Sequence, residues 1–283
     1  AFGEIDQAVR LVKAGADDYL TKPYDVDDLI ERIRKRLRKR GGDVEADGVV
    51  DFALSPVTEL ITEQLRRVAD TDMPVLITGE TGTGKEVAAR YLHATSRRAQ
   101  KPFVAVNCGA IPHELLESQF FGHERGAFTG ASQSHVGFFE EARDGTLLLD
   151  EVGELDARLQ IALLRVLEDG RFRPVGSRTD RSFQGRIIAA TNADLDTMRI
   201  QKTFREDLYY RLSVIEISLP PLRHRTAEIE PLVERLLKQT SLRHGLAVRT
   251  VSPEAFAALV HHEWPGNVRE LRNRLERASV LAR

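Results

Sequence analysis

The sequence predicts an α/β fold, in which a mostly parallel sheet flanked by helices precedes a small all-helical subdomain. Short apolar runs alternate with stretches of helical periodicity between residues 52 and 220. A glycine-rich turn joins the first of these apolar runs to a helix. After residue 220 only helical patterns remain, at residues 227–243, 253–261 and 267–282. Strands that alternate with helices favour a parallel sheet, with the functional residues at the carboxyl ends of its strands.

Composition places few limits on the partners of this chain. Its 283 residues include 41 basic and 43 acidic side chains, so charge alone requires neither a nucleic acid nor a membrane. Cys108 is the only cysteine and cannot form an internal disulfide, which favours a reducing, cytoplasmic location. No run approaches the ~20 apolar residues of a membrane span. The first residues, which lack an initiator Met and signal-peptide character, suggest a piece of a longer protein.

Residues 1–24 and 25–51 form separate segments before the α/β region. In the first, a helical pattern ends at Gly15 and a short strand is expected at residues 18–21. In the second, Leu29, Ile30, Ile33 and Leu37 recur at helical spacing under a basic stretch. That stretch is the solvated face of a linker helix or, alternatively, the face of a helix that pairs with its copy in a dimer.

The α/β region, residues 52–220, begins with a helix at Ser55-Pro56, since serine is a good N-cap and proline suits the first turn. Its buried face is predicted to contain Leu60, Ile61, Leu65 and Val68. Buried strands are expected at residues 75–78, 103–106, 146–151 and 186–192, the last two with polar ends, and further helices at 112–121 and 159–167. Residues 221–283 supply the helical subdomain, in which Asn267 is expected to cap the last helix.

The glycine-rich turn has the pattern of a phosphate-binding loop. Its glycines allow backbone N–H groups to converge on phosphate oxygens at the start of a helix, and its lysine can reach the β- and γ-phosphates. Glutamate stands at the last position, where serine or threonine usually holds Mg²⁺. The expected nucleotide-binding residues are Gly79, Glu80, Thr81, Gly82, Thr83, Gly84, Lys85 and Glu86.

Two adjacent acids, Asp150 and Glu151, follow the apolar run at residues 146–149. Downstream of a phosphate loop this is the Walker B arrangement, in which Asp150 holds Mg²⁺ through water and Glu151 polarises the attacking water. The acids could instead cap the following helix. Asn192 also follows a buried strand, so it is expected at the same edge of the sheet.

Residues 122–137 are rich in glycine and polar side chains and interrupt the helical pattern. Phenylalanine is more often a core residue, but Phe128 lies between Gly126 and Gly130 in a polar stretch, which favours an exposed loop tip.

These motifs together resemble the central AAA+ ATPase domain of bacterial sigma-54-dependent activators, also called enhancer-binding proteins. The resemblance covers residues 52–283 and includes the glutamate at position 86. Its most specific element is the hexapeptide Gly126, Ala127, Phe128, Thr129, Gly130 and Ala131, which contacts sigma-54 in that family. Residues 14–23 resemble the last third of a response-regulator receiver domain, so the order of segments is similar to that of NtrC-type regulators.

The resemblance implies roles for further residues. Arg205 and Arg211 match arginine fingers that reach the nucleotide of a neighbouring subunit; taken singly, each is more often a surface charge. Asn192 matches sensor I, and Arg269 matches sensor II. Asn107 matches an asparagine that restrains the Walker B glutamate.

The implied function is ATP- and Mg²⁺-dependent remodelling of sigma-54 RNA polymerase, by a hexameric or heptameric ring that is dimeric when inactive. A sensor kinase would act upstream, and promoter or enhancer DNA would be bound only through a helix-turn-helix domain missing from this chain. Two alternatives remain: a regulatory module that acts on ordinary polymerase without remodelling it, and a general AAA+ motor on nucleic acid. Relatives of the first kind tend to lose the loop around Phe128, and the second would not need it.

Overall fold

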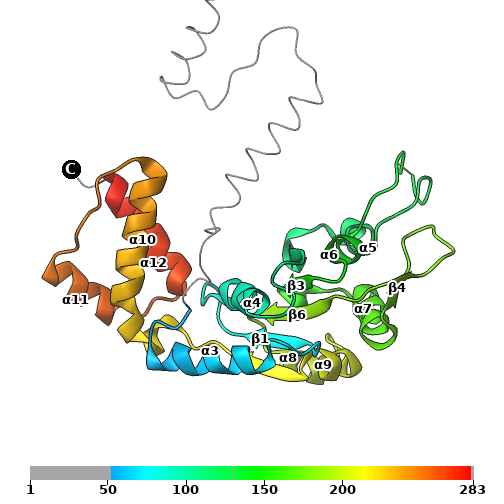
Figure 1. Cartoon of the computed structure of the whole chain (residues 1–283), viewed down its shortest axis with the longest axis horizontal. Helices are drawn as coiled ribbons and strands as arrows, with labels where there is room; N and C mark the ends of the chain where they lie inside the picture. The colour runs from blue at the N-terminus through cyan, green and yellow to red at the C-terminus, as the bar shows by residue number, and fades with distance from the viewer. Residues whose placement is uncertain (1–51, 130, 282–283) are drawn as a thin grey trace, which may run out of the picture. The chain divides into compact units, whose positions relative to one another are not determined.

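The computed structural model describes residues 52–129 and 131–281 (Figure 1). The predictions for segments 1–24 and 25–51, including the strand at residues 18–21 and the pairing helix, lie outside these residues, as does Gly130.

A five-stranded sheet with the order β2-β3-β6-β1-β7 forms the centre of the α/β region. Every neighbouring pair in this sheet is parallel, as predicted. The strands are β1 (Val75–Thr78), β2 (Phe103–Asn107), β3 (Thr146–Asp150), β6 (Arg186–Thr191) and β7 (Ile215–Ser218). The first four were predicted from the sequence. Strand β7 was not predicted, because it is a short edge strand with only one buried residue, Ile217, and lacks a continuous apolar run.

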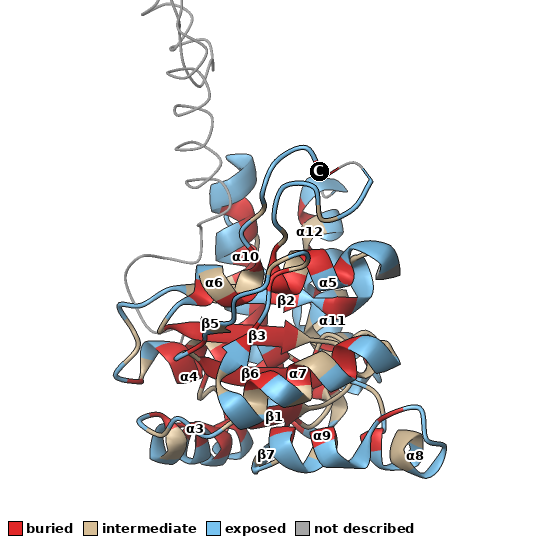
Figure 2. Cartoon of the chain, turned by 90° about the vertical axis from the view of Figure 1, so that its right-hand side faces the viewer, coloured by how far each residue is buried: buried red, intermediate tan, exposed pale blue. Residues whose placement is uncertain are grey.

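Two layers of helices cover the sheet (Figure 2). Successive strand residues point to opposite faces, so Leu147 and Leu149 lie in one apolar cluster and Leu148 in another. The cluster around Leu148 includes residues of α3 (Pro56–Val68) and α4 (Lys85–Ala94). The other cluster includes residues of α5 (His113–Phe121), α6 (Phe138–Ala142), α7 (Ala157–Asp169), α8 (Leu195–Ile200) and α9 (Glu206–Leu212).

Helix α3 begins as predicted but buries a different face. Ser55 is its N-cap and forms a reciprocal capping box with Thr58. Ile61 and Leu65 are buried, whereas Leu60 is 65% exposed, so its assignment to the buried face was wrong. Thr58 and Thr62 lie inside instead; the Thr62 hydroxyl donates to the Thr58 carbonyl, which satisfies its polar group without an external partner.

Shorter elements complete the α/β region. A hairpin of β4 (Arg171–Phe172) and β5 (Arg181–Ser182) follows α7. Single 3₁₀ turns occur at η1 (Cys108–Ala110), η2 (Val152–Glu154), η3 (Leu222–His224) and η4 (Thr226–Glu228). The two-residue strands are too short to give a periodic signal in the sequence.

The helical subdomain comprises α10 (Ile229–His244), α11 (Pro253–His261) and α12 (Asn267–Leu281), as predicted. It has a separate apolar core, in which Trp264 is almost fully buried. No helix among the described residues is long and apolar enough to cross a membrane.

Candidate nucleotide site

The phosphate loop connects the carboxyl end of β1 to the first residue of α4, Lys85. Gly82 and Gly84 have φ angles of +80° and +105°, a region that side chains disfavour. The Gly84 position provides no side-chain cap for α4, so the first N–H groups of the helix remain available to an anion. The loop is therefore built to surround phosphate oxygens with backbone donors.

Lys85 is buried within this loop. Its Nζ donates to the carbonyl of Gly79 at 2.9 Å and lies 3.8 Å from Oε1 of Glu151. Burial lowers the pKa of the Lys85 ammonium, while the negative charges of Glu151 and Asp150 oppose that shift. The ammonium is therefore held near the two acids by weak contacts that a phosphate group can replace.

The two acids meet the loop at the edge of the sheet. Asp150 ends β3, and burial, followed by the neighbouring charge of Glu151, raises the pKa of its carboxyl group. Glu151 has a left-handed backbone conformation, with φ of +55°, which is uncommon for a residue with a side chain. Its Oε2 accepts from the backbone N–H of Asn192 at 3.2 Å.

Asn192 connects these acids to the phosphate loop, because its Nδ2 donates to Oγ1 of Thr81 at 2.9 Å. Asn107 ends β2 directly beside Asp150 in the register of the sheet. Within the described residues no hydrogen bond joins Asn107 to Glu151. The edge of the sheet thus brings together two carboxylates, an ammonium and two amide side chains, which suits Mg²⁺–nucleotide chemistry.

Two predicted residues, Glu86 and Arg269, lie at the margin of this site. The Glu86 carboxylate faces outward and accepts from Nε and Nη2 of Arg90 at 2.9 and 2.7 Å. Arg269 is exposed and lines a pocket of about 320 Å³ together with Thr81. Its positive charge also contributes to the lowered pKa of Lys85, which places it near the phosphate loop.

The two candidate arginine fingers lie apart from the phosphate loop of their own chain. Arg205 precedes α9 and forms a two-pronged ion pair with Asp207, with Nε–Oδ1 and Nη2–Oδ2 distances of 3.0 and 2.6 Å. Arg211 is exposed, in the last turn of α9. No hydrogen bond or ion pair among residues 52–129 and 131–281 joins either arginine to the loop. Both guanidinium groups are therefore accessible to another molecule.

Contacts between the helical subdomain and the phosphate loop were not predicted from the sequence. We name the residues that make them, Glu80, Arg223 and Asn267, the lid clamp. Arg223 donates to both carboxylate oxygens of Glu80, at 3.0 and 2.6 Å, and lowers the pKa of that carboxyl group to about 2. Nδ2 of Asn267 donates to Glu80 Oε2 and to the Thr81 carbonyl, both at 3.1 Å.

Asn267 was predicted to cap α12, and this prediction was wrong. It is fully buried, and its Oδ1 accepts from the backbone N–H of Leu222 at 2.7 Å. Its backbone has a positive φ of 50°, and its side chain points back to the loop. No local pattern reveals such a contact, because its partners are distant in sequence. Arg225 adds a similar link by donating to the Thr83 carbonyl at 2.5 Å.

The glycine-flanked loop has an exposed tip and an anchored base. Phe128 is 43% exposed and Thr129 is exposed, as predicted, whereas Ala131 is buried. The Gly126 N–H donates to the Ala131 carbonyl at 2.8 Å, which closes the turn. We name residues 122–137 the presenting loop; it projects from the α/β region together with the β4–β5 hairpin in Figure 1.

This hairpin supports the base of the presenting loop. Val175 accepts from the Glu124 N–H at 3.0 Å and donates to the Gly122 carbonyl at 2.9 Å. A methyl group on Gly176 would lie 2.8 Å from Cβ of Ala127, so glycine is required for this close approach. The two segments therefore move as one unit unless these contacts break.

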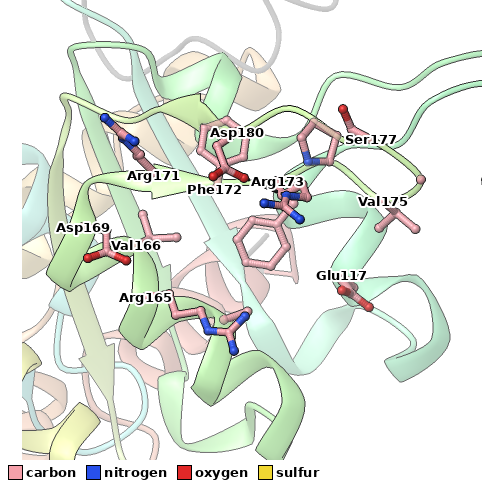
Figure 3. Close-up of a pocket in the computed structure, with 14 residues that line it drawn as sticks. Glu117, Arg165, Val166, Asp169, Arg171, Phe172, Arg173, Val175, Ser177 and Asp180 are labelled. Carbon is pink, nitrogen blue, oxygen red and sulfur yellow. Dashed lines mark hydrogen bonds and ion pairs between the residues drawn. The ribbon is translucent and has the colours of Figure 1, made fainter.

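A pocket of about 790 Å³ lies below this hairpin, between α7 and the segment from Arg171 to Asp180 (Figure 3). Arg173 and Asp180 form an ion pair at its wall, with an Nε–Oδ1 distance of 2.7 Å. None of the predicted nucleotide-binding or catalytic residues lines it. The chemistry described above is therefore outside this pocket.

A phosphate loop on a parallel sheet, paired acids at the next strand end and a helical subdomain bonded to the loop define a P-loop NTPase with a helical lid. Residues 52–218 match the sigma-54 interaction domain, and residues 223–283 match the AAA+ ATPase lid domain. The chain therefore belongs to the sigma-54 interaction domain family and contains an AAA+ ATPase domain.

Several named proteins are similar to this chain. The response regulator protein FleR of Pseudomonas aeruginosa is 47% identical over 281 residues, which is 99% of this chain and 59% of FleR. The transcriptional regulatory protein ZraR of Salmonella typhimurium is 43% identical over 287 residues, 99% of this chain and 65% of ZraR. The chain thus spans about three-fifths of the length of these relatives.

A solved structure shares the fold. The crystal structure of NtrX from Brucella abortus in complex with ADP is 38% identical, with a TM-score of 0.77 over 99% of this chain and 62% of NtrX. The predicted α/β fold with a helical lid is therefore confirmed, and nucleotide binding agrees with the ligands of this relative.

Proposed function

We propose that this chain is the ATP-hydrolysing part of a transcriptional activator that remodels sigma-54 RNA polymerase holoenzyme within a two-component system. The observation that carries the proposal is the presenting loop. Phe128 and Thr129 are exposed on a segment that is anchored to an ATPase domain but lies outside its nucleotide site. An exposed phenylalanine stabilises the monomer little, so burial against a partner is its expected benefit.

The chemistry follows from the site. Lys85 and the loop N–H groups bind the phosphates of ATP, and Asp150 holds Mg²⁺ through water. Glu151 activates the attacking water; its carboxylate is bonded to the Asn192 backbone and lies near Lys85, which supports this position. Asn192 responds to the γ-phosphate, and its bond to Thr81 supports that role. Asn107 restrains Glu151 from the neighbouring strand end, and its place beside Asp150 in the sheet supports this role.

Catalysis requires a second subunit. Arg205 and Arg211 stabilise transition-state charge at the site of the next subunit in a hexameric or heptameric ring. Their exposure and their separation from the loop of their own chain support this arrangement.

Residues 52–220 and 221–283 form the motor and its lid, and the N-terminal segments 1–24 and 25–51 carry the receiver remnant and a dimerising linker. A sensor kinase acts through the receiver.

Thr129→Ala tests the proposal, with Thr250→Ala on an exposed lid loop as the matched control. No hydrogen bond joins the Thr129 hydroxyl to another residue within 52–129 and 131–281, so we expect folding to be preserved and ATP hydrolysis to remain within a few-fold. Open-complex formation on a sigma-54 promoter should be lost in Thr129→Ala and retained in Thr250→Ala. Binding to sigma-54 with a transition-state mimic of ATP should fall in parallel. Normal promoter opening by Thr129→Ala would show that the presenting loop is not the coupling element and would refute the proposal.

A further inference from the structure

Gln160, in the first turn of α7, is 1% exposed, and both atoms of its amide are used. Its Nε2 donates to the carbonyls of Leu155 and Thr203, at 2.9 and 3.0 Å. Its Oε1 accepts from the backbone N–H of Arg205 at 2.8 Å. A single side chain thus joins three segments of the chain.

Two of these bonds fix the start of the finger segment. Thr203 and Arg205 flank Phe204, which is 2% exposed in the apolar core. Phe204 holds the segment by its side chain, and Gln160 holds the backbone on both sides of it. Since Arg205 is the last residue before α9, these bonds determine where the helix begins and where the Arg205 side chain leaves the surface.

The third bond connects the same amide to the segment that carries the acids. Leu155 directly follows the 3₁₀ turn η2, which begins immediately after Glu151. The Leu155 carbonyl is thus separated from the water-activating carboxylate by one tight turn. The amide therefore joins this segment directly to the finger segment through hydrogen bonds of ordinary length.

We propose that Gln160 is a positioning residue for the arginine finger, which ties the Arg205 segment of each subunit to the acid-bearing segment of that same subunit. The inference rests on the proposed function, in which these arginines act on the neighbouring nucleotide. A shift of Glu151 upon hydrolysis then moves the finger that serves the next site. Successive sites in the ring are linked by this amide.

The test uses Gln160→Glu, which keeps the size of the side chain but places an oxygen opposite two carbonyls. The finger segment should shift, and displacement of a catalytic group by about 1 Å can cost about 10²-fold in rate. We expect ATP hydrolysis by homogeneous rings to fall at least about tenfold. ATP affinity should stay within about twofold, because the phosphate loop is untouched. Gln239→Glu, on the exposed face of α10, is the matched control and should leave both quantities unchanged.

Mixed rings distinguish positioning from general damage. As a reference, Arg211→Ala mixed with Glu151→Gln should recover hydrolysis, since one subunit supplies the carboxylate and the other the finger. Gln160→Glu should recover hydrolysis when mixed with Glu151→Gln, because it retains an intact nucleotide site. It should not recover with Arg211→Ala, since both partners then lack a working finger. Gln160→Met, which removes every hydrogen bond but retains the length, should give the same pattern if Gln160→Glu fails to fold.

Three results would overturn the inference. Recovery with Arg211→Ala but not with Glu151→Gln would place the defect in the variant's own nucleotide site. Unchanged hydrolysis by homogeneous Gln160→Glu rings would show that Gln160 does not position the finger. A parallel loss of ATP affinity and thermal stability in Gln160→Glu and Gln160→Met would show that Gln160 has only a structural role. Failure of the reference pair in proven mixed rings would instead refute the trans fingers on which this inference rests, whereas the role of the presenting loop is tested separately by Thr129→Ala.

Discussion

Replacing Asn267 by aspartate tests whether the lid holds the phosphate loop in place. The substitution preserves size and the acceptor for the Leu222 N–H. It replaces the amide donor with an oxygen that faces the Glu80 carboxylate and the Thr81 carbonyl. Two attractive contacts of a fully buried group thus become repulsive, and ATP must bind to a loop that has lost its support.

The expected magnitude follows from burial. The Glu80–Arg223 pair is exposed to solvent, so its attraction is screened and contributes little to stability. Asn267 is 0% exposed, and each buried polar partner left without a bond costs about 1–3 kcal/mol. Loss of two such bonds therefore destabilises the domain by about 2–6 kcal/mol. For a domain of this size the melting temperature should fall by about 4–24 °C.

Two measurements check this expectation. Thermal melting reports the loss of stability, and titration with a fluorescent ATP analogue should show affinity reduced by about tenfold or more. Asn273→Asp introduces the same charge on the same helix at an exposed position and is the control. If Asn267→Asp melts within 1 °C of the parent and binds ATP within twofold, the clamp does not support the loop.

The lid clamp also predicts a pH dependence. Arg223, with help from Asn267, lowers the pKa of the Glu80 carboxyl group from its ordinary 4.5 to about 2. A group with a depressed folded-state pKa stabilises the fold fully above its unfolded pKa. The contribution of the clamp should thus be complete at neutral pH and disappear as pH falls from about 4.5 toward 2. Its size is limited by the solvent exposure of the pair.

Three further predictions concern the site, the presenting loop and the cysteine. Lys85→Ala should weaken ATP binding by about one to two orders of magnitude, because one charge-assisted hydrogen bond is lost. Glu151→Gln should bind ATP nearly normally and stop turnover. Affinity and hydrolysis assays on both variants check this, and normal turnover by Glu151→Gln would contradict it. Gly176→Ala should separate the hairpin from Ala127, so that ATP hydrolysis persists but promoter opening falls; opening at the parental rate would show that the contact is dispensable. Burial raises the pKa of the Cys108 thiol to about 12, so iodoacetamide at pH 8 should label this thiol only after unfolding. Mass spectrometry measures the labelling, and rapid labelling of the native protein would contradict the burial of Cys108.

The sequence predicted those parts of the fold that depend on local pattern. Four of the five strands of the central sheet, the phosphate loop and the three lid helices have strong periodic or glycine signals, and the structure places them as expected. Asp150 and Asn192 could be placed at one edge of the sheet because parallel strands end on the same side. Exposure of Phe128 followed from its flanking glycines and polar neighbours.

Features that depend on tertiary contact could not be predicted in this way. Leu60 has helical spacing with its apolar neighbours, yet two threonines occupy the buried face instead, since they satisfy their hydroxyls within the helix and its cap. Asn267 lies at the start of α12, where a cap is expected, but its amide donates to the carbonyl of Thr81 in the phosphate loop, which is distant in sequence. Gln160 lies in an amphipathic helix, where its burial has no signal of its own.

Helix α7 explains how the nucleotide site and the presenting loop can be connected although they lie far apart in sequence. Its first turn carries Gln160, bonded to the segment after Glu151. Its last residue leads through Gly170 into the hairpin that pairs with the presenting loop at Val175. Thirteen residues of helix span about 20 Å, and a close-packed interior transmits a displacement along such an element instead of absorbing it. A shift at the first turn of α7 should therefore move the hairpin and the loop base together, so the exposed tip can serve a partner without contacting the nucleotide.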